Sequence, residues 1–393
     1  MKILIGSDIA PPYIGGGEEY VINLGKTLVK MGHEVHWISS KIPGTKDKEN
    51  YEGIIIHRVP IPFKKYYHFP GRQFFFATSV FPGVQLAKEM DIVQMNTLVA
   101  APFGWVIPKL ARKPSVMFAH ELFGKKLWSQ IGQNLFEKIV YPYMENKMAH
   151  APYDHYICPS NYSKQSLVKY GTTPRKITVI PHGLNFELFN PKKDKTDFRK
   201  KFGLEEFKLF GYAGRLKIKK TAQSKNLISL LHAVPHILKT VKNAKIVFQG
   251  LGFEELEPEV RKMKLEEHVI WLGEKYGKDF RFNSHFYKMC DLIVCPALSE
   301  GFDFMLANAS ASGVPIVATN CGAHPDRIIN EKNGLLTGTK PEQIADGIVK
   351  VLTNDSLAKK FGKEGVNFSK KFTWKKSAEA HLKVYESVIK KHK

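Results

Sequence analysis

The sequence has few cysteines, and none of them is spaced as in a metal site or a redox centre. Its 393 residues contain only Cys158, Cys290, Cys295 and Cys321. There is no Cys-x-x-Cys pair, and no cysteine clusters with histidine at the spacing of metal ligands. Each lies in or beside an apolar run, so we expect buried free thiols and no bound metal. Such usage fits a reducing compartment.

Long apolar segments are also missing. No uncharged stretch reaches the about 18–20 residues that a membrane-spanning helix needs. The best candidate, residues 97–108, is too short and contains two prolines. The chain starts directly with a strand-like segment, so we expect no signal peptide. These features predict a cytoplasmic protein that is soluble or peripheral on the inner face of the cell membrane.

Acidic residues are scarce relative to basic ones. The chain has 37 Asp and Glu against 59 Lys and Arg, a formal net charge of +22. Such an excess favours polyanionic partners, which are nucleic acids, anionic lipid headgroups or phosphorylated substrates. No nucleic-acid-binding module is recognisable, so we expect no nucleic acid partner. The length and the globular composition indicate two domains of about 180 residues each.

Short apolar runs alternate with helical patterns along the chain, which predicts parallel sheets with helices on both faces. A helix is expected over 18–31, with Gly32 ending it. A polar, basic segment at 181–201 has the composition of a linker. The sequence therefore predicts an α/β protein with two Rossmann-like, doubly wound domains facing a cleft, 1–182 and 183–372. The expected strands are 2–6, 33–38, 54–59, 92–96, 115–120, 155–160 and 177–181 in the first domain, then 207–214, 244–250, 269–273, 291–297, 314–319 and 334–337.

Two loops at the ends of predicted strands have the residues of a phosphate site. Gly15, Gly16 and Gly17 follow the first strand and open a helix, where backbone amides attract anions. Arg215 and Lys225 lie in the loop after the first strand of the second domain, and their cations suit a diphosphate. A tight structural turn and a solvated basic loop are the alternative explanations.

The segment 295–328 is the most informative one. Glu300 lies with Gly301 in a strand-to-helix turn, followed by a helix of small residues and another strand. A carboxylate in such a turn is placed to accept hydrogen bonds from sugar hydroxyls. A helix-capping glutamate is the alternative interpretation.

At this point the sequence resembles a known group of proteins, the large retaining GT-B clan of glycosyltransferases. This clan includes glycosyltransferase family 4, bacterial glycogen synthases, sucrose synthases and phosphatidylinositol mannosyltransferases. The resemblance runs almost end to end, and the order and spacing of the matching stretches make it specific. It implies a GT-B fold whose last helix, 373–393, crosses back onto the first domain. The matching stretches include GGGEEYV, VIPHGLNFELFNP, GYAGRL, FQGLGFEEL, VIWLGE, SEGF and VPIVATNCGAHPDRI.

The resemblance also implies roles for particular residues. Arg215 and Lys225 would clamp the diphosphate of a nucleotide-sugar, Glu300 would face the hexose, and His120 would lie near the reacting sugar. A histidine at a strand end is otherwise usually structural, and Lys219 or Lys220 could replace Lys225 because the loop is longer than usual. The implied donor site comprises Gly16, Gly17, Arg215, Lys225, Glu300, Gly301, Phe302, Asp303, Phe304, Met305 and Asn308.

Two positions depart from the family pattern. The family has a second glutamate eight positions after Glu300, on the nucleotide ribose, where this chain has Asn308. The residue that is usually glycine in the turn is Asp303. A neutral hydrogen bond is weaker than a charge-assisted one, so we expect roughly tenfold weaker donor binding from Asn308.

The expected activity is transfer of a hexosyl unit with retention, from a UDP- or GDP-sugar to a glycan or a lipid-linked acceptor. Side-chain cations can stabilise the departing diphosphate, and no Asp-x-Asp pair requires a metal, so we expect no cofactor. The alternative is a degenerate relative that binds nucleotide or a partner without turnover.

Two segments mix basic and aromatic residues, 60–81 and 124–147. The second is a predicted helix with Leu127, Ile131, Leu135 and Ile139 on one face. An anionic membrane surface would attract both segments. Packing into the core is the alternative explanation of the apolar residues.

We predict that Asn308→Glu tightens donor binding up to about tenfold, because a charged acceptor replaces a neutral one at the ribose. The apparent donor KM should change more than kcat, since the ribose is held equally in the ground and transition states. Calorimetry with nucleotide-sugars on both proteins measures this effect. Weaker binding by the glutamate variant would contradict a simple ribose contact.

Overall fold

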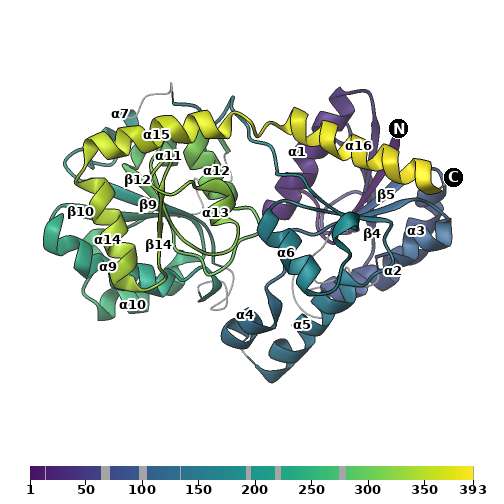
Figure 1. Cartoon of the computed structure of the whole chain (residues 1–393), viewed down its shortest axis with the longest axis horizontal. Helices are drawn as coiled ribbons and strands as arrows, with labels where there is room; N and C mark the ends of the chain where they lie inside the picture. The colour runs from purple at the N-terminus through teal and green to yellow at the C-terminus, as the bar shows by residue number, and fades with distance from the viewer. Residues whose placement is uncertain are drawn as a thin grey trace. The chain divides into compact units, whose positions relative to one another are not determined.

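The computed structural model divides the chain into two compact units (Figure 1). Unit 1 is Met1–Gly183 with Phe372–Lys393, and unit 2 is Leu184–Lys371. Both boundaries lie one residue from the predicted ones. The structure describes residues 1–13, 15–62, 71–96, 104–132, 134–191, 196–216, 223–273 and 280–392.

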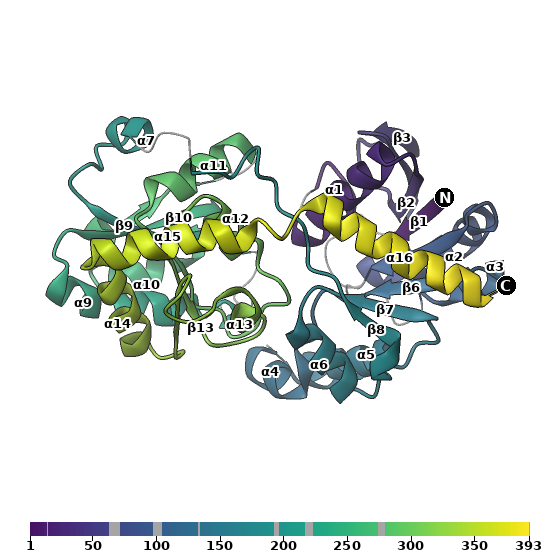
Figure 2. The same cartoon turned by 45° about the horizontal axis from the view of Figure 1, so that its top comes forward.

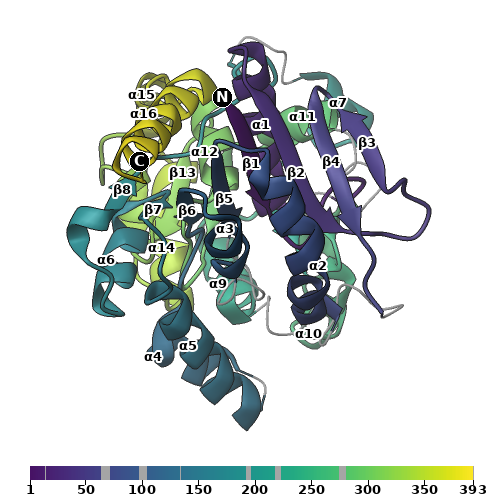
Figure 3. The same cartoon turned by 90° about the vertical axis from the view of Figure 1, so that its right-hand side faces the viewer.

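Unit 1 is built on an eight-stranded sheet in the order β3-β4-β2-β1-β5-β6-β7-β8. Figure 3 shows β3 to β7 side by side in this order. All neighbouring strands are parallel except β3, which pairs antiparallel with β4. The strands are β1 (Lys2–Gly6), β2 (Glu34–Ser40), β3 (Lys48–Tyr51), β4 (Ile54–Val59), β5 (Ile92–Asn96), β6 (Ser115–Phe118), β7 (His155–Cys158) and β8 (Ile177–Val179).

Helices cover both faces of this sheet, because successive side chains of each strand point to opposite faces. In β1, Ile3 and Ile5 join one buried apolar cluster, which also contains residues of α1 and α16. Leu4 joins a second cluster on the other face. The described helices of unit 1 are α1 (Gly16–Lys30), α2 (Gly71–Lys88), α3 (Val106–Ala111), α4 (Gly124–Ile131), α5 (Leu135–Ala149), α6 (Asn161–Lys169) and α16 (Trp374–His392), with a 3₁₀ turn at Pro174–Lys176.

Unit 2 contains a six-stranded, fully parallel sheet in the order β11-β10-β9-β12-β13-β14. Its strands are β9 (Lys208–Arg215), β10 (Ala244–Leu251), β11 (Val269–Trp271), β12 (Leu292–Cys295), β13 (Ile316–Thr319) and β14 (Leu335–Thr337). Its described helices are α7 (Thr196–Lys201), α9 (Leu227–Thr240), α10 (Glu257–Lys262), α11 (Phe280–Met289), α12 (Phe304–Ala311), α13 (His324–Arg327), α14 (Pro341–Leu352) and α15 (Asp355–Ser369), with 3₁₀ turns at Phe253–Leu256 and Glu266–His268.

The predicted α/β class with two Rossmann-like domains is confirmed, two local predictions are wrong, and one strand was not predicted. The segment 181–201 is not all linker, because α7 forms within it and Arg199 pairs with Asp291 at 2.7 Å. The segment 124–147 is not one helix, because α4 ends at Ile131 and Asn134 caps a new helix, α5. The short strand β3 had no apolar run to predict it. No helix among the described residues is long and apolar enough to cross a membrane.

The C-terminal helix α16 returns to unit 1 and packs along α1 (Figure 2). Its contact with the sheet is a buried chain of hydrogen bonds. The Tyr385 hydroxyl donates to Gln94 Oε1 at 2.6 Å, and Gln94 Nε2 donates to the Tyr20 hydroxyl at 3.1 Å. The Tyr20 hydroxyl also bonds His381 Nε2 at 2.8 Å. These groups attach the last helix to β5 and α1 inside the core.

We expect Tyr385→Phe to lower the free energy of unfolding by about 1–3 kcal/mol, because Gln94 Oε1 loses its donor in a buried place. The melting temperature should fall by about 2–4 °C for each kcal/mol. The matched control is Tyr143→Phe, since the Tyr143 side chain is 59% exposed and should leave the melting temperature unchanged. Equal melting temperatures for both variants and the native protein would refute the role of this network.

Candidate functional site

The order of strands in unit 2 defines where a ligand site is expected. From β9 the chain continues to β10 and β11 on one side of the sheet, and then to β12, β13 and β14 on the other. Loops that follow β9 and β12 therefore diverge at a topological switch point. In open parallel sheets, ligands bind at the carboxyl ends of the strands beside this point.

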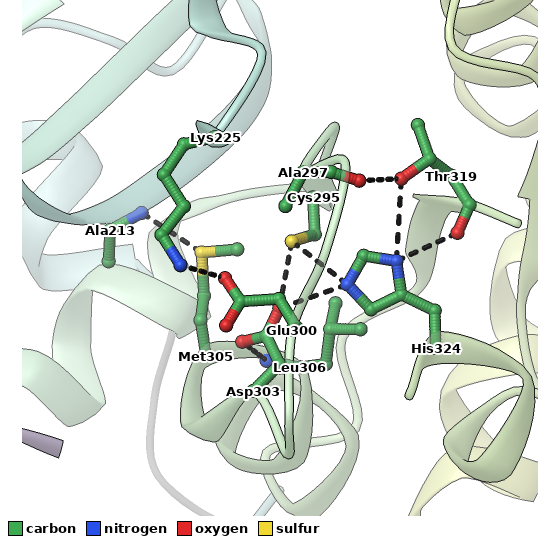
Figure 4. A network of polar contacts seen from close by, with 10 residues as sticks. All are labelled: Ala213, Lys225, Cys295, Ala297, Glu300, Asp303, Met305, Leu306, Thr319 and His324. Atoms are coloured by element: carbon green, nitrogen blue, oxygen red, sulfur yellow. Dashed lines mark hydrogen bonds and ion pairs between the residues drawn. The ribbon is translucent and has the colours of Figure 1, made fainter. Parts of the chain in front are cut away.

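Lys225 and Glu300 meet at the switch point. Lys225 follows β9, Glu300 follows β12, and the Lys225 ammonium bonds Glu300 Oε1 (Figure 4). The Lys225 side chain is 24% exposed to solvent and the Glu300 side chain is 15% exposed. Burial raises the pKa of Glu300, and the Lys225 charge offsets part of this increase. Leu298 N also donates to Ser224 O at 2.9 Å, so the backbones of the two loops are joined as well.

The backbone around Glu300 is held by a third loop, which follows β13. Ala323 N donates to Glu300 O at 2.8 Å. Gly322 has φ +55, and a Cβ there would lie 2.4 Å from Glu300 N. Both the left-handed backbone and this close approach require glycine. The loops after β9, β12 and β13 therefore fix the Glu300 carboxylate together.

Asp303 occupies a backbone position that explains the glycine of the family pattern. Its φ is +63, in the left-handed region, which glycine adopts without strain. As the N-cap of α12, its Oδ1 accepts a hydrogen bond from Leu306 N at 3.1 Å. The other carboxylate oxygen, Oδ2, points into the protein interior.

This oxygen joins a buried cluster with Cys295 and His324. Cys295 Sγ lies 2.8 Å from Asp303 Oδ2, and His324 Nε2 lies 3.4 Å from both atoms. Burial alone would raise the pKa of Asp303 and lower that of His324, but their mutual attraction outweighs it and reverses both shifts. Burial and the Asp303 charge raise the pKa of the Cys295 thiol.

Cys295 thus belongs to a group of side chains of metal-ligand type that the sequence analysis did not predict. Its partners Asp303 and His324 lie 8 and 29 positions away in the sequence, so no local spacing reveals them. Cys158, Cys290 and Cys295 are buried thiols outside any disulfide, as predicted, whereas Cys321 is only half-buried.

The remaining predicted residues of this segment surround Glu300 and Asp303. Phe302 is buried, its ring stacked on the Arg327 guanidinium at 3.6 Å and in edge contact with Phe304 at 5.0 Å. Met305 Sδ accepts a hydrogen bond from Ala213 N at 3.1 Å. Gly301 and Asn308 are buried, the latter on α12. Arg327, which burial shifts to a pKa of about 9, is a cation that sequence analysis did not single out.

Arg215 is the last residue of β9, and it pairs with Leu251 in the sheet. Its side chain is half-buried. Next to this pair, Gly250 of β10 lies against Gly214 of β9, and a Cβ at Gly250 would lie 1.8 Å from Gly214 O. The alternative phosphate lysines, Lys219 and Lys220, lie outside the described residues.

In unit 1, Gly16 and Gly17 lie in the first turn of α1, the first helix after β1. The His120 ring follows β6 and packs against Phe118 at 4.7 Å and against Tyr20 at 5.2 Å between ring centroids. Burial lowers the pKa of His120 to about 3, so its imidazole is neutral near pH 7. His182, with its ring 5.8 Å from that of His120, belongs to this aromatic group and lies in the motif VIPHGL, but no role was predicted for it.

Two family models match consecutive parts of the chain. The model of Glycosyltransferase Family 4 matches residues 14–188, and the model of Glycosyl transferases group 1 matches residues 194–368. An uncharacterised glycosyltransferase of Methanocaldococcus jannaschii is 28% identical over 393 residues, covering 99% of each chain.

Solved structures show the same fold. Sucrose-phosphate synthase from Thermosynechococcus elongatus is 20% identical with a TM-score of 0.85, covering 98% of each chain. The Anabaena protein HepE, in complex with UDP-glucose, is 19% identical with a TM-score of 0.78, over 98% of this chain and 100% of HepE. Because the two models span both units and the fold agrees, the chain belongs to the GT-B glycosyltransferases of the family 4 type.

Proposed function

We propose that this glycosyltransferase moves a hexosyl unit from a UDP- or GDP-sugar to a glycan or lipid-linked acceptor, with retention at the anomeric carbon. The observation that carries the proposal is the Lys225–Glu300 pair at the switch point of unit 2. It puts a cation for a phosphate and an acceptor for sugar hydroxyls side by side. The complex of HepE with UDP-glucose supports a UDP-sugar as the first donor to test.

In this proposal, Lys225 and Glu300 give up their contact with each other when the donor binds, and each contacts the donor instead. The Lys225 ammonium leaves Glu300 for the diphosphate, where Arg215 adds a second cation. The freed Glu300 oxygen then accepts a hydrogen bond from the hexose. Because Arg215 and Lys225 then already contact the diphosphate before the glycosidic bond breaks, little reorganisation is needed when negative charge develops on the leaving nucleotide.

Side-chain cations take the role that a divalent ion has in other transferases, so the proposed transfer needs no metal at the diphosphate. His120 acts at the reacting sugar as a neutral imidazole, in line with its lowered pKa. It therefore positions or polarises groups by hydrogen bonding, without adding charge near pH 7.

An anionic membrane surface is the proposed partner of α5. Four apolar side chains of this helix are exposed, whereas Trp128 and Ile131 of α4 are buried, so packing into the core does not explain these four side chains. Lys138 and Lys147 are exposed on α5 too. Aromatic and aliphatic groups beside lysines suit the headgroup region of anionic lipids. The exposed residues are Leu135, Phe136, Ile139 and Tyr143.

Arg215→Ala and Lys225→Ala should each lower the transfer rate by about 10²–10³, because one preorganised charge on the leaving group is lost. Transfer from UDP-glucose and other nucleotide-sugars is the assay, with thermal shift to measure binding of UDP, GDP and ADP. The matched control is Lys350→Ala, since Lys350 also pairs with a glutamate, Glu331, but on the exposed surface.

Near-native turnover in Arg215→Ala and Lys225→Ala would overturn these roles. Binding of UDP or GDP by the native protein without transfer or hydrolysis of any nucleotide-sugar would instead support the degenerate alternative, for which Asn308 and Asp303 are the residues to examine.

Flotation with liposomes tests the membrane partner. We expect the native protein to float with anionic vesicles at low salt and not with neutral ones, since each nearby lysine adds about 1 kcal/mol. Phe136→Asp with Ile139→Asp should abolish flotation, whereas Leu110→Asp, at a residue of α3 that is 58% exposed, should not. Absence of the native protein from the anionic vesicle fraction would end this proposal.

A further inference from the structure

Three buried side chains of different chemical types converge behind the turn that carries Glu300. Cys295 ends β12, Asp303 caps α12, and His324 begins α13. The three ligand atoms, one thiol sulfur, one carboxylate oxygen and one ring nitrogen, lie within 4.8 Å of one another. The Asp303 and His324 side chains are 5% and 0% exposed, and Cys295 is 1% exposed. The mechanism proposed above uses none of these three contacts.

The distances suit a small ion. With separations of 2.8, 3.4 and 3.4 Å, a point equidistant from the three atoms lies about 1.9 Å from each, and an ion slightly out of their plane lies at the about 2.0–2.3 Å of zinc bonds. The two separations of His324 Nε2, from Cys295 Sγ and from Asp303 Oδ2, already suit two ligands of a tetrahedral zinc ion. Only the Sγ–Oδ2 separation must lengthen, to about 3.5 Å for a tetrahedral zinc ion.

The surrounding contacts orient the ligand atoms. His324 Nδ1 donates to Thr319 O at 2.7 Å, which turns Nε2 toward Cys295 and Asp303 (Figure 4). Asp303 Oδ1 is occupied by Leu306 N, which leaves Oδ2 for the centre of the cluster. Metal-binding histidines and carboxylates are held by outer hydrogen bonds of this kind.

We propose that Cys295, Asp303 and His324 bind a zinc ion. Thiolate and imidazole ligands favour zinc over magnesium and calcium, which prefer oxygen ligands. The three residues provide three ligands of a tetrahedral site and leave one position for water. Binding of Zn²⁺ releases the thiol proton of Cys295 and the Nε2 proton of the His324 imidazolium. Two positive charges replace two, so the buried site keeps its net charge.

The role of this ion is structural. It joins the end of β12, the N-terminus of α12 and the loop after β13, and the same turn and loop fix the backbone of Glu300. It is separate from the diphosphate contacts of Arg215 and Lys225, so the zinc site stands or falls independently of the proposed transfer reaction.

The first measurement is the zinc content and thermal stability of the full chain without an affinity tag. We expect one zinc ion per chain after purification from zinc-containing medium and dialysis. Zinc chloride at about 100 times its Kd should raise the melting temperature of the chelator-treated protein by about 5–10 °C. Zinc at background level together with an unchanged melting temperature would overturn the proposal. Cys295, Asp303 and His324 would then be held together by hydrogen bonds alone.

The second measurement assigns the ligands. Cys295→Ser should weaken zinc binding by at least about tenfold. It should also remove the sulfur-to-metal charge-transfer band of the cobalt-substituted protein, a band that reports a thiolate ligand. The matched control is Cys290→Ser, another buried thiol of unit 2, which should bind zinc like the native protein.

A further variant keeps the test decisive if Cys295→Ser does not fold. Asp303→Gly removes one ligand while placing the residue that the left-handed backbone at φ +63 favours. It should fold and still lose zinc. Retention of zinc by both Cys295→Ser and Asp303→Gly, or equal loss from Cys290→Ser, would show that the ion is bound elsewhere.

Discussion

A carboxylate that is mostly buried must have its own cation, and this constraint organises the site of unit 2. Glu300 lies in the turn after β12, where burial raises its pKa and the positive charge of Lys225 offsets part of that increase. Such a pair forms only if the loops after β9 and β12 approach each other closely. The backbone bond from Leu298 N to Ser224 O joins these two loops, and Gly322 allows the loop after β13 to approach Glu300 as well. The ion pair, the loop contacts and the switch point thus belong to one arrangement.

Asp303 follows the same rule on the inner side of the turn. A second carboxylate so close to Glu300 would repel it, and His324 and Arg327 supply positive charge nearby. The backbone at 303 is left-handed, a conformation that aspartate tolerates better than most residues because its short side chain can cap the backbone. The substitution of the family's glycine is therefore accommodated by local hydrogen bonding and by a partner from the loop after β13.

The fold was readable from the sequence where apolar runs are long and buried. Strand β12 is apolar throughout, and β1 is apolar after its first residue, Lys2, as expected of parallel strands covered on both faces. The edge strand β3 is polar, so no hydrophobic pattern indicated it. The break between α4 and α5 depends on Asn134 as a cap. The site divides in the same way. Glu300 and Lys225 stand in recognisable motifs, but the cluster of Cys295, Asp303 and His324 forms only after the connection from β12 to α12 and the segment after β13 have been brought together.

The two departures from the family pattern are best understood together. The resemblance implies a glutamate at position 308, on the ribose, and a glycine at 303, whereas this chain has asparagine and aspartate. The chain therefore has two carboxylates in this region, Glu300 and Asp303, and the second faces the protein interior instead of standing at position 308, where the resemblance implies a contact with the nucleotide. An outward carboxylate can be stabilised by hydrogen bonds from hydroxyl groups of the donor and from water. An inward one needs a protein cation or a bound ion, because burial of an uncompensated charge is costly. His324, which is buried and contacts Thr319 O through Nδ1 and Asp303 Oδ2 through Nε2, is the protein group that meets this need.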